Sequence, residues 1–267
     1  MSETAGKERV AKRIARSGLC SRRDAERLIA ERRVEVDGIT IESPALDVLP
    51  SHLVTVDGER LPAAEQPRLF RFHKPKGVLT TERDPRGRPT IYDRLPPNLP
   101  RLIPVGRLDF NSEGLLLLTN DGGLKRGLEL PATGWLRRYR VRVHGTVDPA
   151  RLEELKGGIE VEGIHYGGIE ARLDRTQGSN SWLTMGLREG KNREVRKVLG
   201  HLGLDVNRLI RVSFGPFQLG ALAEGAVEEV TGKVLREQVG KLVPLAPPGE
   251  ARARRRRAAG GAAAVEG

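Results

Sequence analysis

One acidic residue, Asp109, stands where a carboxylate could do chemistry. It lies in a polar turn between Gly106 and Gly114, with Arg107 two positions before it and a run of four leucines, 115–118, after it. The leucine run is typical of a buried strand, so we expect Asp109 at the edge of that strand. A carboxylate held there can act as a nucleophile or a proton acceptor, and an ordinary turn aspartate is the alternative interpretation.

Signatures of other chemistries are absent from the sequence. The scattered histidines form no His-Glu-x-x-His helix, and there is no glycine-rich phosphate loop and no Gly-x-Ser-x-Gly turn. The single cysteine, Cys20, excludes an intramolecular disulfide and a zinc site built from several cysteines. The sequence therefore predicts no metal ion and no small-molecule cofactor, and its cysteine content fits the reducing cytoplasm.

The composition limits the architecture and the class of partner. The chain has 267 residues, enough for two domains, and only 4% aromatic residues, so its core must consist largely of Leu, Val and Ile. No apolar run approaches the ~20 residues of a membrane-spanning helix, so we expect no membrane partner. The net charge of +11 indicates an anionic partner, with nucleic acid the first candidate; charge that serves only solubility is the alternative.

The charge is unevenly distributed along the chain. Residues 7–33 carry ten Lys and Arg against four acidic residues, whereas residues 34–62 carry one Arg against six. The last 22 residues are mainly Pro, Gly, Ala and Arg and have little to bury, which predicts disorder. We therefore expect an N-terminal module at 1–62, a linker at 63–68, a second domain at 69–245 and a disordered basic tail at 246–267.

The N-terminal module is predicted to contain two helices and a small sheet. Apolar spacing predicts a short helix over 8–17, and Ser21 with Asp24 has the form of a capping box that starts a second helix, ending near Arg32. Three short β signals follow, at 34–36, 39–41 and 54–56. An Asp-Gly pair after the first and after the third predicts a hairpin turn at each place.

This arrangement resembles a known RNA-binding domain. The run from Arg9 to Gly38, RVAKRIARSGLCSRRDAERLIAERRVEVDG, resembles the domain first described in the fourth protein of the small ribosomal subunit. In that family the paired helices sit on structured RNA. The resemblance therefore implies RNA contacts from five arginines, which would act mainly on phosphates: Arg13, Arg16, Arg22, Arg23 and Arg27.

The second domain carries five motifs that resemble those of pseudouridine synthases that modify ribosomal RNA. They occur in the family's order, beginning at Lys74 and ending at Phe217. The motifs are Lys74-Pro75-Lys76-Gly77, Gly106-Arg107-Leu108-Asp109, Arg138-Tyr139-Arg140-Val141, the run 189–196 (EGKNREVR), and Arg208-Leu209-Ile210-Arg211 with Gly215-Pro216-Phe217. The Asn-Arg-Glu-Val-Arg form of the fourth motif, with GRPT at 87–90 and DRLP at 93–96, is most similar to the large-subunit branch, although the family often has His-Gln at 193–194.

The resemblance implies a reaction and a site. The N-glycosidic bond of a uridine would break, the uracil would turn and rejoin through carbon, and the base would first be flipped out of its helix. Asp109 would be the catalytic carboxylate, Arg196 would pair with it, and Tyr139 would stack on the uracil. Arg107 and Leu209 would line the substrate pocket. The alternatives are a phosphate-binding Arg196, a core Tyr139 and a Leu209 that only packs.

The resemblance also implies a fold and a partner. We expect an α+β chain in which a catalytic domain with a largely antiparallel central sheet follows the RNA-binding domain. The partner would be ribosomal RNA, of the large subunit, or a pre-ribosomal particle, bound by a monomer. Lys74, Lys191 and Arg193 would contact RNA, with a role in the domain frame as the alternative for Lys74. The rival functions are the same reaction on small-subunit RNA and a non-catalytic assembly factor.

Overall fold

The structure is a computed structural model that describes residues 6–240, so the basic tail expected at 246–267 lies outside the described residues. In the described part, helices combine with mostly antiparallel strands, which confirms the predicted α+β class. Between residues 6 and 240, none of the helices has the length and apolar character needed to span a bilayer.

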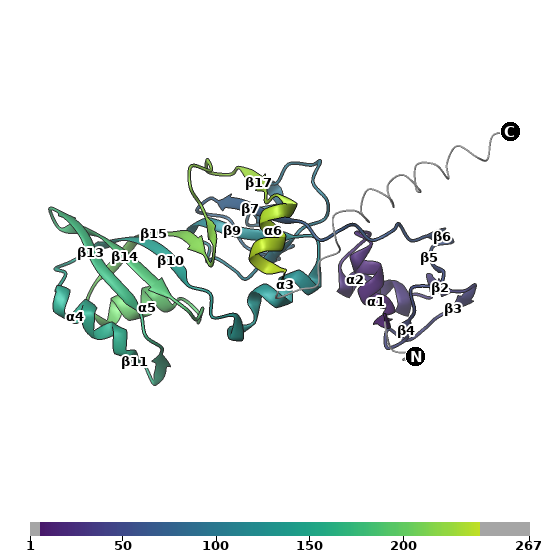
Figure 1. Ribbon diagram of the computed structural model, residues 1–267, viewed down its shortest axis with the longest axis horizontal. Helices are drawn as coiled ribbons and strands as arrows, with labels where there is room; N and C mark the ends of the chain where they lie inside the picture. The colour runs from purple at the N-terminus through teal and green to yellow at the C-terminus, as the bar shows by residue number, and fades with distance from the viewer. Residues whose placement is uncertain (1–5, 241–267) are drawn as a thin grey trace.

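Two short helices pack on a small sheet at the N-terminal end of the chain (Figure 1). The helices are α1 (Val10–Arg16) and α2 (Arg22–Ala30). The sheet has the order β3 (Ile39–Thr40), β2 (Val34–Val36), β5 (Val54–Val56) and β6 (Glu59–Arg60), and β1 (Glu8–Arg9) pairs with β4 (Asp47–Val48). The buried residues of this module form a hydrophobic cluster of their own, so the module has its own core.

Local sequence signals position these elements as predicted. The Ser21 hydroxyl accepts a hydrogen bond from the backbone N–H of Asp24 at 3.1 Å, which caps the start of α2. Asp37 and Gly38, between β2 and β3, have φ of +52° and +81°, and Asp57 and Gly58 repeat this between β5 and β6. Two successive left-handed residues are typical of a type I′ hairpin turn, so both predicted turns are confirmed.

The rest of the described chain is built on one nine-stranded sheet. Its main path runs β13 (Glu170–Gln177), β14 (Asn180–Leu187), β10 (Arg137–His144), β15 (Asp205–Phe214), β9 (Glu113–Thr119), β7 (Leu69–Lys74) and β17 (Val227–Glu229). Off this path, β8 (Ile103–Val105) pairs with β9, and β16 (Phe217–Gln218) pairs with β15. The pairing of β15 with β9 is parallel and the others are antiparallel, as the prediction of a largely antiparallel sheet requires.

The two ends of the sheet have separate cores. Side chains of α4 (Pro149–Glu154), α5 (Glu194–His201) and the hairpin β11–β12 (Ile159–Val161, Ile164–Tyr166) pack against β14, β10 and β15. Side chains of α3 (Gly122–Glu129) and α6 (Gly232–Val239) pack against β7 and β9. The remaining helices are the short 3₁₀ turns η1 (Ile91–Arg94), η2 (Pro131–Thr133) and η3 (Leu155–Gly157).

The two halves meet at a seam between β9 and β15. Gly114 of β9 lies beside Arg211 of β15 and has φ of +104°, a conformation that favours glycine. A Cβ at this position would lie 2.4 Å from the Arg211 carbonyl oxygen. Glycine therefore allows the buried leucine strand to approach β15 closely, directly after the turn that carries Asp109.

Candidate active site

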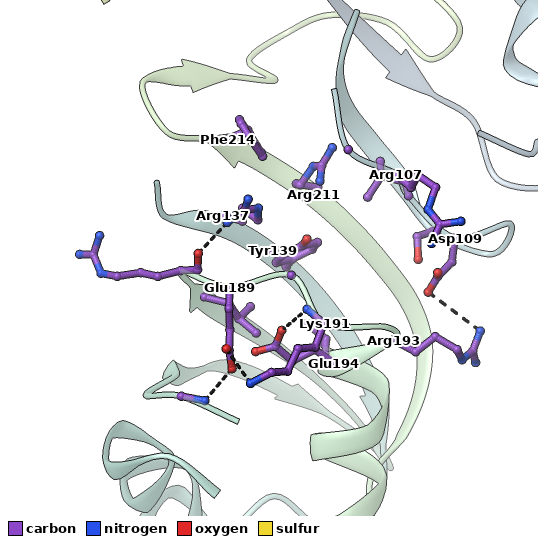
Figure 2. A pocket seen from close by; sticks show the side chains of 18 of the residues that line it. Arg107, Asp109, Arg137, Tyr139, Glu189, Lys191, Arg193, Glu194, Arg211 and Phe214 are labelled. Carbon is purple, nitrogen blue, oxygen red and sulfur yellow. Dashed lines mark hydrogen bonds and ion pairs between the residues drawn. The ribbon is translucent and has the colours of Figure 1, made fainter. Parts of the chain in front are cut away.

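A cavity of about 710 Å³ lies where β10 and β15 meet the turn that precedes β9 (Figure 2). Five separate segments of the chain contribute its walls, at 106–112, 129–139, 167–168, 187–195 and 209–214. Six of the residues predicted from the sequence line it: Arg107, Asp109, Tyr139, Lys191, Arg193 and Leu209. The structure therefore brings together most of the predicted site, whereas Lys74 and Arg196 are not part of the lining.

Lys74 supports the Asp109 turn from beneath. It is fully buried, and its ammonium group donates to the backbone carbonyls of Pro75 (3.0 Å), Asp109 (3.2 Å) and Ser112 (2.9 Å). Burial lowers the pKa of Lys74 to about 8, while the nearby Asp109 and Glu113 act in the opposite direction. Three N–H donors meet three carbonyl acceptors, as a charged ammonium requires. The predicted RNA contact by Lys74 is wrong, because the side chain cannot reach a phosphate.

The Asp109 carboxylate points into the cavity, and Arg193 is the cation that faces it. The Arg193 guanidinium lies 4.0 Å from the Asp109 carboxylate, and the two side chains are 49% and 31% exposed. Figure 2 shows this pair joined by a dashed line. Solvent reaches both groups, so the attraction between them is modest.

The predicted pair between Asp109 and Arg196 is absent. Arg196 instead donates to the carbonyls of Val206 (2.9 Å) and Asn111 (3.1 Å). Burial and the neighbouring Arg193 lower the pKa of Arg196, while Asp109 raises it. Because Asn111 is two residues after Asp109, Arg196 is hydrogen-bonded to the backbone of the turn that carries the carboxylate.

The start of α5 explains which arginine faces Asp109. Arg193 caps this helix in a left-handed conformation, with φ of +52°, and its side chain leaves the helix toward the Asp109 turn. Arg196 follows within the first turn of α5 and faces β15 instead, where it meets the Val206 carbonyl. Arg193, and not the expected Arg196, is therefore the arginine whose side chain faces the Asp109 carboxylate.

Tyr139 and Leu209 form part of the cavity wall on neighbouring strands. Tyr139 is half-buried on β10, and Leu209 of β15 is buried opposite Val141. Both side chains also pack in the hydrophobic core below the cavity, so packing and cavity lining are combined in the same residues.

A second hollow of about 670 Å³ adjoins the first and shares Arg107, Asp109, Lys191 and Arg193 with it. The Arg107 side chain is exposed. The Lys191 ammonium lies 2.7 Å from the Glu189 carboxylate. The two hollows together form a groove whose boundary carries Asp109 and three cations.

Glu194 is a buried acid in the cavity wall. It is 4% exposed, and one carboxylate oxygen accepts the backbone N–H of Lys191 at 2.9 Å. The other oxygen is buried with no hydrogen-bond partner among the described residues. Burial, with a smaller contribution from Glu189, raises the pKa of Glu194 to about 7, while the Lys191 N–H acts in the opposite direction.

Sequence reasoning assigned no role to several residues that line the same cavity. Phe214 lies beneath two guanidinium groups, those of Arg137 at 4.7 Å and Arg211 at 5.3 Å from its ring centre. Glu189, Glu194 and Arg211 lie inside the quoted motifs, whereas Arg137 directly precedes the third motif and donates to the carbonyls of Trp135 and Arg188. Among the unassigned lining residues are Arg137, Glu189, Glu194, Arg211 and Phe214.

The predicted RNA-binding arginines of the N-terminal module differ in exposure and in the partners of their side chains. Arg13 is half-buried and donates to the carbonyls of Leu49 and Pro50, so it holds the module together. Arg16, Arg22 and Arg27 are exposed and make ion pairs with acids of the same module, such as Arg16 with Glu8 at 3.2 Å. Arg23 is exposed with no ion pair or hydrogen bond among the described residues.

Both parts of the chain match known families. Residues 68–201 match the family described as RNA pseudouridylate synthase, and residues 8–54 match the S4 domain. A crystal structure described as that of a pseudouridylate synthase is 26% identical, with a TM-score of 0.60, and the match covers 88% of this chain and 99% of that one.

Relatives with similar sequences carry related names. An uncharacterized RNA pseudouridine synthase from Rickettsia felis is 46% identical over 230 residues, which is 86% of this chain and 100% of the relative. The ribosomal large subunit pseudouridine synthase B of Pasteurella multocida is 41% identical over 243 residues, covering 87% of this chain and 70% of the relative. That of Shigella flexneri is 40% identical over 218 residues, covering 79% of this chain and 75% of the relative.

Proposed function

Because the chain belongs to the RNA pseudouridylate synthase family, it is an enzyme that isomerises uridine in RNA, and we propose that it acts on one uridine of large-subunit ribosomal RNA. Two relatives at 40–41% identity with this target in their names support the choice. The S4 domain supplies a second surface for the RNA partner. The rival of a non-catalytic assembly factor does not agree with the family.

The observation that carries the proposal is that Asp109, Tyr139 and Leu209 line the same cavity. In the reaction the C1′–N1 bond of the uridine breaks, a C1′–C5 bond forms, and the hydrogen on C5 passes to N1. No atom is gained or lost, so the reaction needs no co-substrate. We assign Asp109 as the carboxylate that acts as nucleophile or proton acceptor, since it points into the cavity with a cation 4.0 Å away.

Tyr139 and Leu209 would hold the uracil, and a target base can reach them only when it is flipped out of its helix. Flipping costs a few kcal/mol, and less for a base that is already unpaired, so the substrate is a uridine in a loop or bulge. Arg107, Lys191 and Arg193 at the boundary of the two hollows would hold the flanking phosphates. We keep Arg196 as a residue that positions the Asp109 turn.

The proposal extends to the organisation of the chain. We place the RNA-binding domain at 1–62 and the catalytic domain at 69–245, because residues 63–68 have no regular structure and the N-terminal module has its own core. We propose a cytoplasmic monomer that binds ribosomal RNA or a pre-ribosomal particle and needs no cofactor. The isomerisation transfers no electrons and no chemical group to or from a second molecule, which supports the proposal that no cofactor is needed.

Pseudouridine mapping of ribosomal RNA from a strain that lacks the enzyme tests the proposal. One large-subunit position is expected to lose its pseudouridine, and the wild-type chain is expected to restore it. Asp109→Asn should not restore it although its affinity for RNA stays within a few-fold. Asp205→Asn, which removes an exposed carboxylate of β15, is the matched control and should restore it. Full modification by Asp109→Asn, or a loss confined to small-subunit RNA, would contradict the proposal.

A further inference from the structure

The sheet face opposite α5 carries arginines that the cavity does not use. Side chains alternate along β10, so Tyr139, Val141 and Val143 pack toward the helices, and every second residue points to the other face. The residues on that other face are the exposed Arg138, Arg140 and Arg142. Because Tyr139 lies between Arg138 and Arg140, the cavity and these arginines are on opposite sides of the same strand.

The neighbouring strands add further arginines in register. Arg142 of β10 lies opposite Trp182 of β14 on one side and opposite Arg208 of β15 on the other. Arg175 of β13 lies opposite Trp182 in turn, and Arg172 lies one row away. Since adjacent strands are about 4.8 Å apart, the row of four residues spans about 15 Å. We call the set the outer arginine face: Arg138, Arg140, Arg142, Arg172, Arg175 and Arg208.

Most of this positive charge is not neutralised. Arg172 pairs with Asp174 at 3.1 Å, and Arg208 pairs with Glu113. The other four members form no ion pair among the described residues. Two more carboxylates, Glu170 and Asp205, lie at opposite ends of the face. Asp174 also lies on the face, because its carboxylate accepts a hydrogen bond from the Thr184 hydroxyl at 2.7 Å and Thr184 lies opposite Arg140. The six arginines nevertheless outnumber the carboxylates on the face, and four of the six form no ion pair among residues 6–240.

The side chains of the outer arginine face favour a phosphate backbone over a protein as its partner. The Arg140 guanidinium lies over the Trp182 ring at 4.8 Å, which orders that side chain, and Trp182 is itself only half-exposed. A stable protein interface has an apolar core, and this face offers no apolar group for one beyond Trp182 and the half-buried Ile210. Guanidinium groups bind phosphates in a fork geometry, and a flat row of them matches a backbone with regularly spaced phosphates.

We propose that the outer arginine face binds the phosphate backbone of a second RNA segment, away from the uridine in the cavity. The two RNA segments contact opposite sides of β10, so both can be bound at once only by a substrate larger than the hairpin that carries the target. The contact would add affinity without adding sequence choice, because it involves phosphates alone. The inference rests on the proposed function only in taking RNA as the partner.

A binding experiment with the full chain tests the face without requiring activity. Arg138→Gln, Arg142→Gln and Arg175→Gln are combined in one variant, since these side chains are exposed and form no ion pair or hydrogen bond among residues 6–240 whose loss would disturb folding. The probe is a 24-base-pair RNA duplex of arbitrary sequence, followed by fluorescence anisotropy between 50 and 300 mM KCl (about the range over which phosphate contacts are screened). The control variant removes the same charge from the helices, with Arg151→Gln, Lys233→Gln and Arg236→Gln.

The triple variant is expected to bind the duplex more weakly and with a flatter salt dependence. Each lost phosphate contact lowers the slope of log K against log salt by about 0.9, so three contacts correspond to a loss of up to about 100-fold at 0.15 M salt. The control variant should stay within about threefold of wild type. An unchanged slope, or an equal loss in the control, would overturn the proposal.

Two further arms separate this inference from its rivals. Poly-L-glutamate at the same charge concentration should displace the duplex poorly; equal displacement would assign the face to acidic proteins and overturn the choice of RNA. Pseudouridine formation in a large-subunit RNA transcript should show a raised KM and an unchanged kcat in the triple variant. If wild type forms no pseudouridine while the duplex result holds, the proposed function fails and the outer face stands.

Discussion

Replacement of Glu194 by glutamine should make the free energy of unfolding of the catalytic domain less dependent on pH. Burial raises the pKa of Glu194 to about 7 in the folded chain, from an ordinary value of 4.5. Between these two values the folded state holds a proton that the unfolded state has released. The free energy of unfolding of the wild type therefore falls as pH rises through this window, and the contribution of Glu194 is complete below pH 4.5.

The size of the effect follows from the shift. Each pKa unit corresponds to about 1.4 kcal/mol, so the wild type should lose about 3 kcal/mol between pH 4.5 and 7.5 through this group. Glutamine resembles the protonated acid and can still accept the Lys191 N–H, but it does not titrate. The stability of Glu194→Gln relative to wild type should therefore rise by about 3 kcal/mol across the same window. Lys74 does not interfere, because its lowered pKa of about 8 affects stability only at higher pH.

Urea unfolding at a series of pH values measures this difference. Tryptophan fluorescence is suited to it, because Trp135 and Trp182, the two tryptophans of the chain, both lie outside the N-terminal module. Glu237→Gln, exposed on α6, controls for the loss of one surface charge. A difference between Glu194→Gln and wild type that stays constant within about 0.5 kcal/mol from pH 4.5 to 7.5 would refute the reasoning.

Three further substitutions test the support of the site. Gly114→Ala should cost about 2–5 kcal/mol in urea unfolding, because its Cβ would lie 2.4 Å from the Arg211 carbonyl oxygen at a left-handed φ. Lys74→Met should cost about 3 kcal/mol or more, since three buried carbonyls lose their donor, and a loss below 1 kcal/mol would contradict this role. Arg196→Ala should lower kcat and should lower the free energy of unfolding by about 1–3 kcal/mol, because two backbone carbonyls lose their donor. Arg193→Ala should reduce single-turnover rates no more than about fivefold and leave the free energy of unfolding unchanged, because its ion pair is exposed.

Local features of this fold are predictable because their causes are local. The Ser21 cap, the two Asp-Gly turns and the buried leucine strand each depend on residues a few positions apart, and all four occur where the sequence places them. Four of the five motifs contribute residues to the cavity lining, whereas the lining segments at 129–134 and 167–168 carry no motif.

The errors concern side chains whose partners are distant in sequence. Lys74 can be buried because carbonyls 35 and 38 residues away accept hydrogen bonds from its ammonium group, and no local pattern contains that information. Arg193 rather than Arg196 faces Asp109, and Arg193 has a left-handed backbone conformation at the start of α5 that no motif of the sequence indicates. Glu194 lies in a run of charged residues, so its burial becomes apparent only when the strands are assembled around it.

The parallel seam between β9 and β15 also determines when a growing chain becomes competent. The seam joins Gly114 to Arg211, and the cavity needs walls from both strands, so no catalytic site exists until β15 has been synthesised and has docked. The N-terminal module is complete by Arg60, and at about 5–20 residues per second it can fold on the order of ten seconds earlier. In a nascent chain the RNA-binding domain can thus fold before the catalytic site is complete, and an incomplete chain cannot modify the RNA that it binds.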